Sequence, residues 1–434
     1  MAMLGVRGSV GGLWRDREFV KFWVASAISD LGSQVSTLAL PLVAVLILGA
    51  TPWQMGLLSA AGAAPVLVVG LFAGVWVDRL RRRPVMIAAD VARAGLLLVI
   101  PVASSLGFLT IEILYAVALL AGALAVLFDV AFLSFLPTLV GESNLMDANS
   151  KLEMTSSTAQ VAGPSIGGVL IGAVGAPFAV VIDALSFLGS ALFLLRTRAA
   201  EARPPHAGRA GVVAEVREGL AAVIRHPVLA ALARCSATTS LFSGMFLAVY
   251  VFYMTRDLGL GPVAVGLVFA TGGVGSLAGA LVAGPVARRY GPGPAMVGAI
   301  LLFGLSGMAV PLAVLVPRVA LPMIVGSEFA QWMLVVMYYV TAVSVRQALT
   351  PDRLRGRVNA TMRFLARGAF PLGSLAGGGL GTVIGVPATL ALAACGLALA
   401  FVWLVLSPVR GLRVMPAGQR VREVSAHARL PEIP

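Results

Sequence analysis

Charged residues are scarce in this chain of 434 residues. They make up 12% of the sequence, whereas hydrophobic residues make up 59%. Lys21 and Lys151 are the two lysines, and because neither lies in a glycine-rich loop, the sequence has no phosphate-binding loop of the ATP-driven kind. Direct use of ATP is therefore excluded.

Cysteine and histidine are also rare. Cys235 and Cys395 both lie in long apolar segments, and two cysteines are too few for a disulfide framework or a CxxC metal site. The three histidines lie outside the apolar segments, so a proton pathway inside a membrane would have to use carboxylates. No metal-ligand cluster and no set of nucleophile, base and orienting residue stands out, and we predict neither a cofactor nor an enzyme.

Long apolar segments are what the sequence has in abundance. About 20 residues of helix cross the ~30 Å hydrocarbon core of a bilayer, and the mean hydropathy of the chain is +0.95. We predict an all-α integral membrane protein with twelve transmembrane helices. These spans are expected at 22–48, 54–77, 85–106, 111–139, 152–175, 177–196, 228–254, 263–287, 294–316, 320–345, 357–383 and 387–407.

Basic residues gather on one side of these spans. Clusters precede the first span, separate the second from the third, and recur in the central linker and the tail. Basic residues near span ends are retained in the cytoplasm, so we predict a bacterial-type inner (plasma) membrane protein with both termini cytoplasmic. The net charge of +13 then reflects topology and not nucleic-acid binding. Residues 1–21 lack an apolar core with a cleavage site, and the first span is expected to act as the targeting signal.

The sequence repeats itself at an offset of 210 residues. Matching residues include Gly62 and Gly272, Pro84 and Pro294, and Gly163 and Gly373. Because six spans return a chain to its starting side, we expect two parallel six-helix halves related by a pseudo-two-fold axis along the membrane normal. The expected parts are a cytoplasmic N-terminal segment, an N-terminal half, a cytoplasmic linker, a C-terminal half and a cytoplasmic tail, at 1–21, 22–196, 197–226, 227–407 and 408–434. A basic amphipathic stretch in the linker, 213–225, is expected on the cytoplasmic surface.

Ionisable residues inside the spans are the first candidates for function, because a charge there costs roughly 2.5 to 3.5 kcal/mol on the insertion scale. In the first span, Ser26, Asp30, Gln34 and Thr37 are spaced by four, four and three, so they share one helical face, which is expected to line a cavity. Further candidates for proton or substrate contact in a cavity are Asp129, Arg234, Glu328, Trp332 and Tyr339.

Three other ionisable residues in the spans are given structural explanations. Asp90 and Arg93 are three residues apart close to a cytoplasmic end, and we expect a structural ion pair. Asp183 lies close to an interface in the sixth span and is expected to be solvated.

The loop after the second predicted span carries a recognisable motif. It reads Gly74-Val-Trp-Val-Asp78-Arg79-Leu-Arg-Arg82-Arg83. This resembles the signature loop G-x-x-x-D-R-x-G-R-R/K of the major facilitator superfamily of secondary transporters, with Arg81 in place of the usual glycine. The variant is similar to the branch that contains bacterial exporters of drugs, siderophores and other metabolites. The resemblance implies a gating loop in which Asp78 binds the start of span 11 in one state of the transporter. The alternative is that the arginines of the loop only determine the topology of the chain.

A second motif lies in the fifth predicted span, where the sequence reads Gly163-Pro164-Ser165-Ile166-Gly167-Gly168. This segment resembles the motif that marks antiporters of the same superfamily. The resemblance favours export over import, and it implies a bent helix that seals one state against ion leak. Ordinary close packing of small residues four apart is the alternative explanation.

The resemblance also implies alternating access, with spans 1 and 4 lining a central cavity. Asp30 and Asp129 are then the best pair for proton handling, because removal from water favours the neutral form of a carboxylate; a purely structural role is the alternative. We predict a monomeric, proton-coupled exporter of amphipathic drugs, siderophores or secondary metabolites, with a small molecule and the lipid bilayer as its partners. An importer of a small nutrient, and a non-transporting membrane sensor or partner subunit, are the alternatives.

Overall fold

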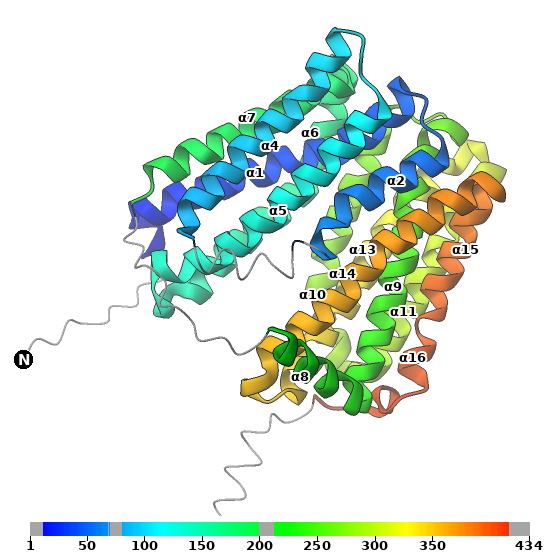
Figure 1. Ribbon diagram of the computed structural model, residues 1–434. Helices are drawn as coiled ribbons and strands as arrows, with labels where there is room; N and C mark the ends of the chain where they lie inside the picture. The colour runs from blue at the N-terminus through cyan, green and yellow to red at the C-terminus, as the bar shows by residue number, and fades with distance from the viewer. Residues whose placement is uncertain (1–11, 68, 70–79, 199–211, 416–434) are drawn as a thin grey trace, which may run out of the picture. The chain divides into compact units, whose positions relative to one another are not determined.

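Every regular element that the computed structural model describes, in residues 12–67, 69, 80–198 and 212–415, is a helix. Ten of the described helices are long and apolar enough to cross a membrane (Figure 1). Two of the twelve expected spans are not among them. The span expected at 54–77 runs into residues outside the description, and the span at 357–383 falls in α14 (Asp352–Val383), whose arginines and glycines lower its hydropathy.

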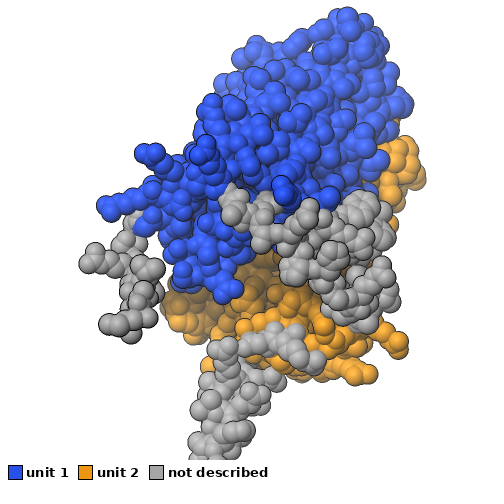
Figure 2. Space-filling view, turned by 60° about the vertical axis from the view of Figure 1, so that its left-hand side comes forward, with its two compact units in different colours: residues 1–48, 64–207 blue, residues 49–63, 208–434 orange. Residues whose placement is uncertain are grey.

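The described helices form two compact units, coloured separately in Figure 2. The first unit takes its residues from 1–48 and 64–207 and contains α1 (Arg17–Leu42), α4 (Arg82–Ser105), α5 (Ile111–Val140), α6 (Leu145–Val174) and α7 (Ala176–Arg196). The second takes its residues from 49–63 and 208–434 and contains α2 (Pro52–Ala63), α8 (Val212–Arg225), α9 (Pro227–Phe252), α10 (Pro262–Tyr290), α11 (Pro292–Gly307), α12 (Ala309–Leu312), α13 (Ala320–Leu349), α14, α15 (Val386–Leu399) and α16 (Val402–Val405).

Helix α2 is the one element whose contacts depart from the expected halves. By sequence it belongs to the N-terminal half, whereas its packing groups it with the second unit. A Cβ atom at Gly56 would lie 2.6 Å from the carbonyl oxygen of Ser374, and the hydroxyls of Ser59 and Ser374 are 3.0 Å apart. Glycine at position 56 therefore lets α2 lie directly against the backbone of α14.

The 210-residue repeat is visible in the backbone. A π-helical turn follows α1 at Val43–Ile47, and another follows α9 at Tyr253–Asp257. Glycines with φ values in the left-handed region recur at the same offset: Gly49 and Gly259 have φ of +62° and +67°, and Gly175 and Gly385 have +85° and +86°. Because other residues rarely adopt this region, the glycines fix equivalent turns in the two copies of the repeated sequence.

Helix packing repeats at the same offset. In the first unit a Cβ at Gly167 of α6 would lie 3.3 Å from the Cα of Val35 in α1. In the second unit a Cβ at Gly377 of α14 would lie 2.8 Å from the Cα of Met245 in α9. Gly377 lies 210 residues after Gly167, and Met245 lies 210 residues after Val35, so the duplicated sequence builds the same glycine-mediated helix pair twice.

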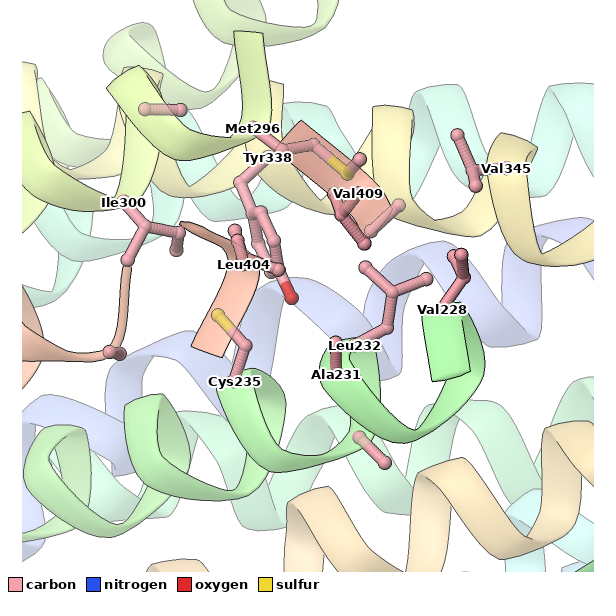
Figure 3. Close-up of a cluster of buried hydrophobic side chains, with 14 of the residues drawn as sticks. Val228, Ala231, Leu232, Cys235, Met296, Ile300, Tyr338, Val345, Leu404 and Val409 are labelled. Carbon is pink, nitrogen blue, oxygen red and sulfur yellow. The ribbon is translucent and has the colours of Figure 1, made fainter. Parts of the chain in front are cut away.

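The hydrophobic core of the second unit is drawn in Figure 3. Most of its buried residues come from α9, α11 and α13, and α8, α10, α14, α15 and the segment after α15 add others. The cluster includes Val228, Leu232, Cys235, Met296, Ile300, Tyr338, Val345, Leu404 and Val409. The first unit has its own core, in which Phe22 stacks on Phe132 with a centroid separation of 4.6 Å. Each unit therefore has a separate interior that can hold polar groups in place.

The linker helix α8 packs against α14 within the second unit. A Cβ at Gly219 would lie 2.8 Å from the carbonyl oxygen of Arg357, and Glu218 forms a salt bridge with the Arg357 side chain. Val223 of α8 is buried. One side of the amphipathic helix expected from the linker sequence is thus covered by protein.

We predict that Gly373→Ala destabilises the protein, because the new Cβ would lie 1.7 Å from the carbonyl oxygen of Leu241 in α9. Overpacking of this kind typically costs about 1 to 3 kcal/mol. Thermal unfolding of the purified protein in detergent measures the effect. Gly298→Ala is the matched control, since nothing lies within 4 Å of a Cβ there; equal melting temperatures for the two variants would contradict the packing.

Candidate functional site

A cleft of about 510 Å³ in the first unit is the strongest candidate for a site. Helices α1, α5 and α6 build it, and its lining residues are Ser26, Asp30, Phe132, Leu133, Asn149, Ser150, Leu152, Glu153 and Ser156. The lining therefore combines apolar side chains from α5 with hydroxyl, amide and carboxylate groups from α1 and α6. Such a mixture suits an organic molecule with both apolar and polar parts.

Helical spacing explains why these polar groups lie together. Ser26 and Asp30 are four residues apart on α1, and Asn149, Glu153 and Ser156 occupy positions i, i+4 and i+7 of α6. Each set therefore shares one face of its helix. The α1 face was expected from the sequence, whereas Glu153 was missed; the i, i+4, i+7 spacing in α6 is the signal that would have found it.

The cleft is electrostatically negative. Asp30 is partly buried and interacts with the carboxylates of Asp129 and Glu153 and with the guanidinium of Arg93. None of the nine side chains that line the cleft is basic. A positively charged group placed beside Asp30 and Glu153 would therefore be attracted to both carboxylates.

The other residues of the expected α1 face have different surroundings. Gln34 lies against α6, where a Cβ at Gly163 would be 2.4 Å from the Gln34 Cβ. The Thr37 hydroxyl donates to the Ser33 carbonyl oxygen at 2.8 Å. The structure thus places Ser26 and Asp30 in the cleft, and Gln34 at the contact between α1 and α6.

The antiporter-like segment forms that contact. Gly163, Pro164, Gly167 and Gly168 are all buried in α6. Gly163 and Gly167 allow the α6 backbone to approach Gln34 and Val35 of α1 closely. A partner within the same unit therefore accounts for the buried glycine face.

The expected gating loop is described only in part. Gly74, Asp78 and Arg79 lie outside the described residues. Arg83 donates to the carbonyl oxygens of Leu194 and Leu195, at 2.7 and 2.5 Å, and Arg82 donates to Thr138 Oγ1 at 3.3 Å. Since the last carbonyls of a helix lack partners within it, Arg83 caps the C-terminal end of α7.

Asp90, Arg93 and Asp183 lie together in the interior of the first unit. The Arg93 Nη1 atom is 4.0 Å from Asp90 Oδ1, and its guanidinium carbon lies 3.8 Å from the centroid of the Phe187 ring. Asp183 is 2% exposed and interacts with Arg93. The expectation that Asp183 is solvated is wrong, because α1 and α4 pack against α7 and cover it.

Glu328 of α13 is held by two aromatic donors in the second unit. The Tyr250 hydroxyl donates to Glu328 Oε2 at 3.0 Å, and the Trp332 indole nitrogen donates to Oε1 at 2.8 Å. Glu328 and Tyr250 are buried, whereas 38% of Trp332 is exposed. Both carboxylate oxygens of a buried acid are thereby satisfied.

The remaining residues expected in a cavity do not join Glu328. Arg234 is exposed on α9, with its guanidinium 5.5 Å from the centroid of the Trp403 ring of α16. Tyr339 is 64% exposed on α13. The structure therefore groups Asp30 with Asp129 and Glu328 with Trp332, and leaves Arg234 and Tyr339 separate from these groups.

Comparison with known proteins identifies the family. The chain matches the family described as transmembrane secretion effector over residues 12–426. It is 30% identical, over 93% of its length and 96% of the relative's, to the multidrug efflux pump Tap of Mycobacterium tuberculosis. It is 26% identical, over 92% of its length and 94% of the relative's, to the enterobactin exporter EntS of Escherichia coli.

A solved structure shares the fold. The nucleoside transporter NupG superposes with a TM-score of 0.72 at 11% identity, covering 90% of this chain and 99% of NupG. The resemblance drawn from the sequence motifs is confirmed, and the chain belongs to the transmembrane secretion effector family as a membrane transporter of the major facilitator superfamily and not an enzyme.

Proposed function

We propose that this transporter exports amphipathic organic cations in exchange for protons. The cleft of α1, α5 and α6 is the observation that carries the proposal, since it places Asp30 and Glu153 beside Phe132 and Leu133. An organic cation pairs its charge with a carboxylate and its rings with aromatic and aliphatic side chains. The efflux pump and exporter among the relatives support the outward direction.

The negative charge of the cleft favours cationic substrates over anionic ones. An anionic siderophore would need a basic group in the cleft, and neither Arg93 nor Arg234 lines it. Arg93 lies beside Asp90, and Arg234 lies over Trp403. A cationic drug or metabolite is therefore the better fit.

Competition for one carboxylate would couple the substrate to the proton. Asp30 can bind either a proton or the positive charge of a substrate. The nearby carboxylates of Asp129 and Glu153 repel an ionised Asp30 that has neither a proton nor a cation. Binding of a cation would then release the proton. Because one proton enters for each monovalent cation that leaves, the exchange moves no net charge, and the pH difference across the membrane drives export with about 1.4 kcal/mol for each ten-fold difference in proton concentration.

The proposed architecture is the twelve-span arrangement of two parallel six-helix halves working by alternating access. The 210-residue recurrence of π-helical turns, left-handed glycines and glycine-mediated contacts supports the two halves. The distribution of basic residues supports cytoplasmic termini in a bacterial inner membrane. We propose that a monomer carries out the cycle.

Efflux from bacterial cells that lack their own drug pumps tests the function. We predict that cells expressing this protein export a lipophilic cation, and that Asp30→Asn lowers the initial efflux rate at least about ten-fold, the equivalent of ~1.4 kcal/mol. Glu153→Gln should lower the rate less, because Glu153 is more exposed than Asp30.

Two comparisons make this test specific. Glu112→Gln removes an exposed carboxylate of α5 that does not line the cleft and should leave efflux unchanged. A neutral compound of similar shape has no charge to pair with Asp30, so wild-type cells should export it more slowly than the cation. Efflux of an anion in preference to the cation, or accumulation of the compounds above control cells, would contradict the proposal.

A second prediction assigns Glu328 to the structure of the second unit. Tyr250→Phe removes the donor to a buried carboxylate and should cost about 1 to 3 kcal/mol of stability. Thermal unfolding in detergent measures the loss. Tyr115→Phe is the matched control, since the Tyr115 hydroxyl has no hydrogen-bond partner among the described residues. If Tyr250→Phe left stability intact but abolished efflux, Glu328 would belong to the transport mechanism.

A further inference from the structure

A buried polar cluster lies where α1, α4 and α7 meet, apart from the residues that line the cleft. Its members are Ser36 of α1, Asp90 and Arg93 of α4, and Asp183 and Ser190 of α7. Asp90 and Ser190 are 0% exposed, and Asp183 is 2% exposed. The cluster therefore lies in a region from which water is largely excluded.

Charge in this cluster does not balance. Asp90 and Asp183 supply two carboxylates, whereas Arg93 is the one cation that interacts with them among the described residues. The other charged groups that interact with Arg93 are Asp30 from α1 and Asp129 from α5, and both are acidic. Fully ionised, the cluster would carry at least one uncompensated negative charge in a medium of low dielectric constant, which is costly.

Several oxygens in the cluster are unpartnered. Neither oxygen of Asp90 makes a hydrogen bond to any described residue, and the same holds for the hydroxyls of Ser190 and Ser36. Asp90 interacts with Ser190, and Asp183 interacts with Ser36 and accepts a hydrogen bond from Ser186 at 3.1 Å. Asp90 beside Ser190, and Asp183 beside Ser36, therefore keep capacity to accept further bonds in a region of excess negative charge.

Glycine at position 32 helps to enclose the cluster. A Cβ there would lie 2.7 Å from Asp183 Oδ1 and 2.0 Å from the Ser186 hydroxyl. The backbone of α1 therefore lies directly on Asp183, and a side chain at this position would push the helices apart. Close helix packing therefore excludes a large ligand from Asp183.

Packing alone does not require these charges. At the 210-residue offset, Asp90, Arg93 and Asp183 correspond to Ile300, Phe303 and Ala393, which are buried in the second unit. The duplicated fold thus closes the same position with apolar side chains. A buried group that the fold can replace by apolar residues is a candidate for function.

We propose that Asp90 and Asp183 together bind one monovalent cation, a proton or a sodium ion, which neutralises the negative charge left over after Arg93. A proton would bind to one of the two carboxylates and leave the other to balance the charge of Arg93. A sodium ion would be held by carboxylate oxygens together with a neighbouring hydroxyl, that of Ser190 beside Asp90 or that of Ser36 beside Asp183. Either occupant adds one positive charge and makes the cluster of Asp90, Arg93 and Asp183 neutral.

Melting temperatures of the full-length protein in detergent test this site independently of transport. In choline chloride, the wild-type melting temperature should fall by several degrees from mildly acidic to mildly alkaline buffer, because loss of the proton leaves a buried negative charge. Asp183→Asn leaves Asp90 and Arg93 as a neutral pair, so its curve should be flatter and lie above that of the wild type in alkaline buffer. Asp90→Asn should behave in the same way, and it replaces Asp183→Asn if that variant fails to accumulate.

Sodium distinguishes the two occupants. If sodium binds, replacing choline by sodium in alkaline buffer should raise the wild-type melting temperature and leave the Asp183→Asn value unchanged; if only a proton binds, the two salts should act alike. Glu112→Gln, at an exposed site, should follow the wild type throughout. A constant loss of stability in both aspartate variants at every pH, with either salt, would overturn the proposal and leave an ordinary structural ion pair.

Discussion

The cost of placing a charge away from water is the constraint on which this structure depends. The protein handles each buried acid of its helices in a specific way. In the first unit Arg93 is the cation shared by several aspartates, and its guanidinium also lies over the Phe187 ring. In the second unit Glu328 is satisfied by two neutral donors, Tyr250 and Trp332. We propose that the buried acids of the first unit serve the movement of charge, whereas Glu328 serves the structure of the second unit.

The duplicated sequence repeats the helix packing of the two units but not their charged residues. Both units pack a glycine face of one helix against another helix at matching positions, Gly167 on Val35 and Gly377 on Met245. The polar residues do not repeat. Asp30 corresponds to Ser240, and in the opposite direction Glu328 corresponds to Ala118. Equivalent backbones thus carry different charges, so the two units are suited to different tasks.

Much of the fold could be predicted from the sequence, because hydropathy and the 210-residue repeat are properties of the chain itself. Long apolar segments predicted the helices, and close packing, the alternative explanation of the glycines in the fifth span, agrees with the contact of Gly163 and Gly167 with α1. Helix α2 was harder, since its grouping with the second unit depends on Gly56 meeting the backbone of α14, a contact between distant segments. The docking of α8 on α14 through Gly219 depends on tertiary contacts in the same way.

The site was predictable where it follows one helix face and not where several helices meet. Ser26 and Asp30 were found from their spacing on α1, but Glu153 reaches the same cleft from α6. Asp183 was expected to be solvated because it lies close to an interface in the sixth span. The position along the span does not reveal which helices pack over the side chain. Only the packing of α1 and α4 on α7 reveals that it is buried beside Arg93.

Proton flux measured together with substrate flux tests the central claim most directly. Purified protein would be sealed into liposomes with an acidic lumen that contains a pH-sensitive dye, and a lipophilic cation would be added outside. Our account predicts that the cation enters as protons leave, that the two rates rise together, and that Asp30→Asn abolishes both while Glu112→Gln keeps them. Movement of the cation with no proton flux, or flux that survives Asp30→Asn, would contradict proton exchange at the cleft of the first unit.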